Sequence, residues 1–145
     1  MIEEIEKKIS EMLRDNKALS NQIEVNKKNE EQHLDDVFLD VISVLDAFSR
    51  EEKVIEDHEW NRSDDSQKAI KRLLNAKKKL CTMLEKYEVH KISFEDGFSH
   101  DDYCSVTDTE PFPDKPNGYI VSIEKEGYVR KGHLLRRAEV IIVKN

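Results

Sequence analysis

The chain has 145 residues, of which 38% are charged and 37% are hydrophobic, whereas about a quarter of the residues in a typical soluble domain are charged. This composition excludes one large globular core and favours long solvated helices whose narrow apolar seams are shared between chains. The formal net charge of −7 argues against nucleic acid as a partner, because a phosphate backbone attracts basic surfaces.

The N-terminal residues MIEEIEKKIS lack the basic start, apolar core and small-residue cleavage site of a secretory signal peptide. No apolar run approaches the roughly 20 residues that a membrane-spanning helix needs. The two cysteines, Cys81 and Cys104, are too few to suggest a disulfide framework. We therefore expect a cytoplasmic protein without a membrane partner.

Residues 2–37 carry a heptad pattern, in which apolar side chains three and four residues apart lie along one seam of a helix. This pattern predicts a coiled coil over about residues 1–33. Asn16 also falls on the seam, where a buried asparagine can fix the register of two paired helices. A weak heptad explains Asn16 equally well. The apolar seam residues are Ile2, Ile9, Ile23 and Val37 at one core position and Ile5, Met12 and Leu19 at the other.

From Leu34 to Phe48 the apolar stripe broadens beyond a two-stranded seam, which is typical of a helix in a bundle. A second amphipathic helix is predicted over about residues 66–88, with Ser63 or Asp64 as its N-cap. One chain supplies two antiparallel helices, so two chains would complete a four-helix bundle over about residues 34–88. Trp60, near the end of the first helix, either anchors a partner or, as we favour, packs at the end of the bundle.

All four glycines and all three prolines lie beyond residue 96, so the character of the chain changes after the second helix. The segments 89–94, 119–129 and 133–143 are predicted strands, separated by the turn-rich stretch PFPDKPNG and by Arg130-Lys131-Gly132. The sequence therefore predicts an α+β protein, with a helical region at residues 1–88 and a small, mostly antiparallel β domain at residues 89–145.

The signals for catalysis are weak, because no phosphate-binding loop, nucleophile elbow or HExxH pair is present. His100 and Cys104 lie four residues apart and could join His90 or His133 around zinc. Cys104 could also act as a nucleophile beside a suitably placed base. We expect neither arrangement, and we predict a protein that is not an enzyme and that uses no metal and no cofactor.

The C-terminal third carries the sharpest motif. Gly118, an apolar strand, Gly127-Tyr128, Gly132, Leu134-Leu135-Arg136, Ala138 and Val140 follow in the order of the C-terminal signature of the GrpE family. This part of the chain therefore resembles GrpE proteins, the nucleotide exchange factors of DnaK-type chaperones. Upstream, VISVLDAF and LCTMLEKYEVHKI are similar to the family's segments at the start of the bundle and at its junction with the sheet.

The resemblance implies a parallel coiled-coil homodimer, a dimeric four-helix bundle and a β wing that binds the nucleotide-binding domain of the chaperone. The wing would favour the open nucleotide cleft, from which ADP escapes. Such a protein is a co-chaperone in protein folding and the stress response, with no nucleic-acid partner. The expected chaperone-binding residues are Glu124, Tyr128, His133, Arg136 and Ile142. The expected dimerisation residues are Ile5, Ile9, Met12, Asn16, Leu19, Ile23, Val37, Phe38, Val41, Leu45, Leu73, Leu80 and Leu84.

Several positions depart from the family pattern. His133 stands in the place of an arginine that reaches the chaperone, and Glu88 stands where glycine is usual. Tyr103-Cys104-Ser105 replace a His-Glu-Ala core. For Arg136 two roles remain open, namely a contact with the chaperone or an ion pair within the chain. The chief alternative function is a GrpE-like dimeric scaffold or adaptor without exchange activity. A zinc or thiol enzyme that uses His100 and Cys104 is the third possibility.

Overall fold

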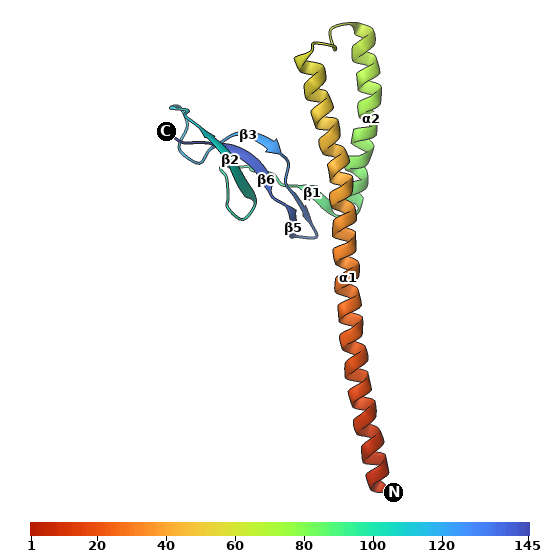
Figure 1. The fold of residues 1–145 in the computed structure, drawn as a ribbon. Coiled ribbons are helices and arrows are strands. Elements are labelled where there is room, and N and C mark those ends of the chain that lie inside the picture. Colours follow the sequence, from red (N-terminus) through yellow and green to blue (C-terminus); the bar gives the residue numbers. More distant parts are fainter. The chain divides into compact units, whose positions relative to one another are not determined.

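The computed structural model describes all 145 residues and confirms the α+β class. Two helices precede six strands (Figure 1). The chain divides into two compact units, Met1–Val37 and Phe38–Asn145. The elements are α1 (Ile2–Asp57), α2 (Asp64–Lys86), β1 (Val89–Lys91), β2 (Cys104–Glu110), β3 (Ile120–Lys125), β4 (Tyr128–Arg130), β5 (His133–Arg136) and β6 (Ala138–Val143).

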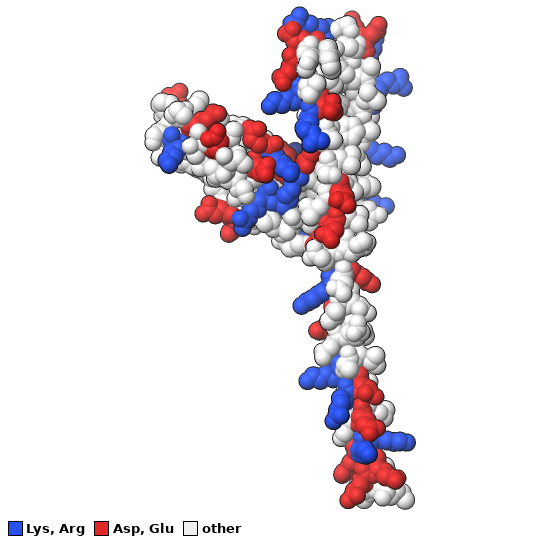
Figure 2. All heavy atoms as spheres, viewed as in Figure 1, with Lys and Arg blue, Asp and Glu red and all other residues white.

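The first unit is helical from Ile2 onward and consists of the N-terminal part of α1. Its apolar seam is solvated in a single copy of the chain, since Ile9 is 51% exposed and Ile23 is 65% exposed. Acidic and basic side chains are interspersed along this unit on the face drawn in Figure 2. The seam is therefore an apolar stripe that one chain alone does not cover.

The two helices meet at a tight connection whose ends are capped by backbone and side-chain hydrogen bonds. Trp60 N donates to Ile55 O (3.1 Å) and Glu59 N to Glu56 O (3.0 Å), while Glu59 adopts a φ of 57°. This is the Schellman arrangement, which satisfies the last carbonyl groups of a helix. The Ser63 hydroxyl oxygen accepts from Ser66 N (3.1 Å), so Ser63 is the N-cap of α2 and the predicted alternative Asp64 is not.

In the second unit, α2 runs back beside the C-terminal half of α1 (Figure 1), and the two helices form a helical hairpin. Lys77 Nζ of α2 lies 2.7 Å from Glu52 Oε1 of α1, which is an ion pair across the hairpin. A core cluster joins the hairpin to the strands that follow it. It consists of Phe38, Ile42 and Leu45 of α1, Leu84 of α2, Val89 of β1 and Tyr128 of β4.

The strands form two three-stranded sheets, with the orders β1-β4-β5 and β2-β6-β3. The pairs β1–β4, β4–β5 and β3–β6 are antiparallel, as expected. The pair β2–β6 is parallel, with Cys104 opposite Ala138 and Val106 opposite Val140, so the β part is mixed. The sequence pattern does not indicate β2, because six of its seven residues are exposed and its acidic side chains are uncommon in strands.

A second core cluster lies on the β2-β6-β3 sheet, where Cys104, Ala138 and Val140 are buried against Phe94, Ile120 and Ile142. Gly127 allows the two sheets to approach each other, because a Cβ atom there would lie 2.6 Å from Ala138 N and 3.0 Å from Arg136 O. The change from helix to strand falls at Tyr87 and Glu88, before the first glycine and the first proline of the chain.

Candidate functional site

The hairpin of β4 and β5 is the most sharply defined feature of the β part. Its two-residue turn places Lys131 at a φ of 49° and Gly132 at a φ of 82°, the combination of positive values that characterises a type I′ turn. This turn matches the natural twist of paired strands and therefore makes a stiff hairpin. His133 pairs with Arg130 directly beside the turn.

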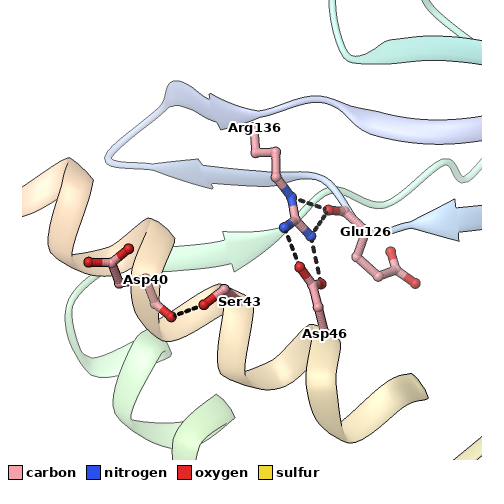
Figure 3. Close-up of polar contacts among 5 residues, drawn as sticks. All are labelled: Asp40, Ser43, Asp46, Glu126 and Arg136. Carbon is pink, nitrogen blue, oxygen red and sulfur yellow. Dashed lines mark hydrogen bonds and ion pairs between the residues drawn. The ribbon is translucent and has the colours of Figure 1, made fainter. Parts of the chain in front are cut away.

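Arg136, at the end of β5, holds this hairpin against α1 (Figure 3). Its Nη1 lies 2.6 Å from Asp46 Oδ2 and its Nη2 lies 2.9 Å from Asp46 Oδ1, which is the bidentate geometry of a strong ion pair. Nε and Nη2 also donate to the carbonyl oxygen of Glu126, at 3.0 and 2.6 Å. The hydrogen bond from Arg136 lowers the pKa of Asp46 below its usual value.

Tyr128 completes this contact from β4. The Arg136 guanidinium lies over the Tyr128 ring, 5.6 Å from the ring centre, and the two residues face each other in the strand register. The Tyr128 side chain belongs to the core cluster that it shares with both helices. Burial raises the pKa of Tyr128 to about 12, so its hydroxyl stays neutral at physiological pH.

Two further contacts tie the β4–β5 hairpin to the helices. Lys131 N donates to Glu88 O (3.1 Å), which joins the tip of the hairpin to the end of α2. The Arg130 side chain is 2% exposed, and its guanidinium lies over the Phe38 ring at 5.6 Å, a geometry typical of a cation–π contact. Together with the Arg136 contact, these bonds fix the hairpin in place on the helices.

The structure brings some of the five expected chaperone-binding residues together and separates others. Tyr128, His133 and Arg136 share the β1-β4-β5 sheet, whereas Glu124 and Ile142 belong to the other sheet. His133 and Glu124 are exposed, and the Glu124 carboxylate accepts from the Ser122 hydroxyl (2.9 Å). Tyr128, Arg136 and Ile142 are engaged in packing within the chain. Only His133 and Glu124 are thus presented to solvent.

The expected dimerisation residues fall into two groups. Phe38, Leu45 and Leu84 are buried in the core of their own chain, and Val41 and Leu80 pack against the same cluster. Leu73 of α2 is 70% exposed. The others are exposed on α1: Ile5, Ile9, Met12, Asn16, Leu19, Ile23 and Val37.

Asp46, Glu88 and Arg130 carry much of the hairpin's support, and none of them is among the expected site residues. Asp46 is the one acidic residue within the apolar segment VISVLDAF, so its position in that stripe is a signal that could have identified it. Glu88 adopts a φ of 60°, which explains why glycine suits this position. Arg130 looks like an ordinary turn residue in the sequence, and no sequence signal marks its burial.

The strands and helices also enclose a cleft of about 430 Å³, whose lining includes Asp46, Lys77, Cys81, His90 and Tyr128. His100 and Cys104, the residues of the proposed zinc or thiol enzyme, do not line this cleft. The Cys104 side chain is 6% exposed and belongs to the second core cluster, and His100 Nε2 lies 2.9 Å from Asp96 Oδ2. No group of three or more histidine, cysteine, aspartate or glutamate side chains is arranged to hold a metal ion.

Neither helix combines the length and the apolar composition that crossing a bilayer requires. A search of curated proteins found no match. The GrpE family model matches residues 1–144, and therefore covers both helices and all six strands. The chain belongs to the GrpE family.

Proposed function

We propose that this chain is a nucleotide exchange factor, which binds the nucleotide-binding domain of a DnaK-type chaperone and promotes the release of ADP. The family match over residues 1–144 is the observation that carries the proposal, since membership supports a DnaK co-chaperone role at the level of the family. The stiff β4–β5 hairpin, which presents His133 beside its turn, suits a rigid binding surface that fits one conformation of a partner better than another.

We infer that the active form is a parallel homodimer. The seam of the first unit supports this, because Met12 is 64% exposed and Leu19 is 62% exposed. Covering such apolar side chains with a partner lowers the free energy of the assembly. The exposed Leu73 of α2 suits the same role in a four-helix bundle built from two helical hairpins. Each dimer would carry two β wings.

The mechanism requires no bond chemistry, and we propose none for this chain. A partner that binds the open cleft more tightly than the closed one shifts the population toward the open form by the ratio of the two affinities. A thousandfold faster release of ADP corresponds to about 4 kcal/mol of differential binding. An interface of ordinary size is able to supply this free energy.

The test is the release of a fluorescent ADP analogue from a purified DnaK-type chaperone of the same cell. We expect release to accelerate with the concentration of the full chain and to saturate. His133→Arg, which restores the residue of the family pattern, should bind more tightly because arginine offers a permanently charged planar fork. Cys104→Ser is the control for thiol chemistry and should release ADP like the unmodified chain.

Binding without accelerated release would favour the alternative function, a dimeric scaffold or adaptor for a chaperone. The affinity is measured separately, by titrating the labelled chaperone with the full chain in excess ADP. A chain that binds no DnaK-type chaperone of its cell contradicts both functions.

A further inference from the structure

The guanidinium of Arg136 is almost fully occupied within its own chain. It makes four hydrogen bonds, two to the Asp46 carboxylate and two to the Glu126 carbonyl oxygen, and a guanidinium has five N–H donors in all. The side chain of Arg136 is 17% exposed and that of Asp46 is 23% exposed. A direct bond from Arg136 to another protein would therefore have to replace bonds that already exist.

The groups around Arg136 come from separate parts of the second unit. Asp46 lies on α1, Glu126 lies between β3 and β4, and the Tyr128 ring beneath the guanidinium belongs to β4. In Figure 3 the Arg136 side chain reaches from its strand to the helix, and the Glu126 carboxylate points away from it. One side chain thus links the helical hairpin to both strands of the β4–β5 hairpin.

From this geometry we propose that Asp46 and Arg136 form a latch, which positions the β4–β5 hairpin for nucleotide exchange without touching the chaperone. His133 stands three residues before Arg136 on the same short strand, β5, so the latch determines where the exposed side chain of His133 lies. The inference rests on the proposed function and adds two positioning residues to it.

A fixed hairpin matters because exchange depends on preferring one form of the partner. A loose hairpin adjusts to the closed cleft as well as to the open one, and a ligand with similar affinity for both states shifts no equilibrium. Loss of the latch therefore lowers the maximal rate of ADP release at saturating concentration of the full chain. The concentration that gives half of this rate changes less.

The experiment is a double-mutant cycle on that maximal rate, with Asp46→Ala, Arg136→Ala and the double variant. We expect each single change to lower the rate roughly fivefold, a coupling of the size found between contacting residues, and the double change to lower it no further. Arg136→Lys should behave like Arg136→Ala, since an ammonium group cannot form the bidentate pair. If Arg136 contacts the chaperone directly, Asp46→Ala frees it and leaves the rate unchanged or higher.

Glu52→Ala provides the matched control. The Glu52–Lys77 pair is also partly exposed, with a separation of 2.7 Å, and it joins the two helices without involving the strands. We expect Glu52→Ala to leave the maximal rate within experimental error of the unmodified chain. A fivefold loss in this control would show that any ion pair of the second unit has the same effect, and would overturn the latch.

A second measurement tests the latch in the free protein. Hydrogen exchange of the amides of residues 128–136 should become at least tenfold faster in Asp46→Ala and in Arg136→Ala, while Glu52→Ala leaves it unchanged. Equal exchange in all four proteins overturns the latch, whatever the chaperone does. If the unmodified chain fails to accelerate ADP release although its latch variants loosen the hairpin, the proposed function fails and the positioning contact stands.

Discussion

The amide nitrogen of Lys131 donates a hydrogen bond to the carbonyl oxygen of Glu88 (3.1 Å), and both residues adopt positive φ values, 49° and 60°. The tip of the β4–β5 hairpin is therefore bonded to the turn at which α2 ends. The residue that accepts this bond, Glu88, has a left-handed backbone, a conformation that side chains with a Cβ atom disfavour.

Glu88→Gly should stabilise the protein. Glycine adopts a positive φ without steric cost, whereas another residue pays about 1–2 kcal/mol there, and the greater freedom of glycine in the unfolded chain offsets part of the gain. We expect the free energy of unfolding to rise by about 0.5–1 kcal/mol, measured by urea denaturation. Glu85→Gly, in the last turn of α2, is the control and should lower the free energy of unfolding by about 1 kcal/mol. A loss of stability in Glu88→Gly would contradict this account.

The ion pair of Asp46 predicts a pH dependence of stability. Because Arg136 lowers the pKa of Asp46 in the folded state, the pair contributes stability above the ordinary aspartate pKa of about 3.9. This contribution is lost as the pH falls through the lowered folded value. The difference in unfolding free energy between the unmodified chain and Asp46→Asn should therefore shrink as the pH is lowered from 6 to 2.5. A difference that is constant over this range, or one that persists unchanged in an Arg136→Gln background, would exclude the pair as its source.

The Tyr128 hydroxyl should lose its proton at a higher pH than that of an ordinary tyrosine. Burial raises its pKa to about 12, so the contribution of this group to stability is complete below the ordinary value of about 10 and is lost as the pH rises through the folded value. The pH titration is followed by absorbance at 295 nm, at which ionised tyrosine absorbs. The chain has four tyrosines, and subtracting the titration curve of Tyr128→Phe from that of the unmodified chain leaves the signal of Tyr128. We expect its ionisation above pH 11, or together with alkaline unfolding followed by circular dichroism. Ionisation near pH 10 in a folded chain would show that the ring is solvated.

Gly127→Ala should destabilise the protein strongly. The new Cβ atom would lie 2.6 Å from Ala138 N and 3.0 Å from Arg136 O. Both are backbone atoms, which cannot move aside as a flexible side chain can. Overpacking of this kind costs about 3 kcal/mol. Gly132→Ala is the matched comparison, since no atom lies within 4 Å of its Cβ position. There only the positive φ opposes the change, at about 1 kcal/mol. Equal losses in the two variants would contradict the close approach at Gly127.

Charged substitutions on the seam of the first unit should dissociate the proposed dimer. Ile9→Lys places an ammonium group on the seam, where two copies would face each other across the coiled coil. We expect sedimentation equilibrium to show at least a tenfold weaker self-association than for the unmodified chain. Glu11→Lys, two residues away and off the seam, should associate normally. A chain that is monomeric before any substitution would contradict the homodimer.

The parts of this structure that the sequence predicts are those that depend on near neighbours. The two helices follow from apolar spacings of three and four residues. The demands of the first helical turn limit the cap of α2 to Ser63 or Asp64, and the structure selects Ser63. The β4–β5 hairpin follows from Gly132 and the strand-like segments on either side of it. Strand β2 does not, because its pairing partner β6 lies about thirty residues away and its exposed face carries no alternating pattern.

The binding partner of the Arg136 side chain could not be predicted from the sequence. Its position within the GrpE-like signature is compatible with a chaperone contact and with an internal ion pair, and nothing nearby in the chain decides between them. The partner is Asp46, ninety residues earlier. The acidic segment that follows β1 supplies no partner to this guanidinium, although the charge pattern alone would favour it.

The sequence alone predicts the α+β class, the GrpE family, a second helix that begins near Ser63 or Asp64, and the turn at Gly132, because periodicity and local sterics depend on neighbouring residues. Three contacts arise only in the folded chain, namely those of Arg136 with Asp46, of the buried Arg130 with Phe38, and of β2 with β6 in a parallel pair. These contacts join residues that are distant in the chain. They form because folding the second unit brings their elements together, and no local pattern encodes which of several possible partners will be within reach.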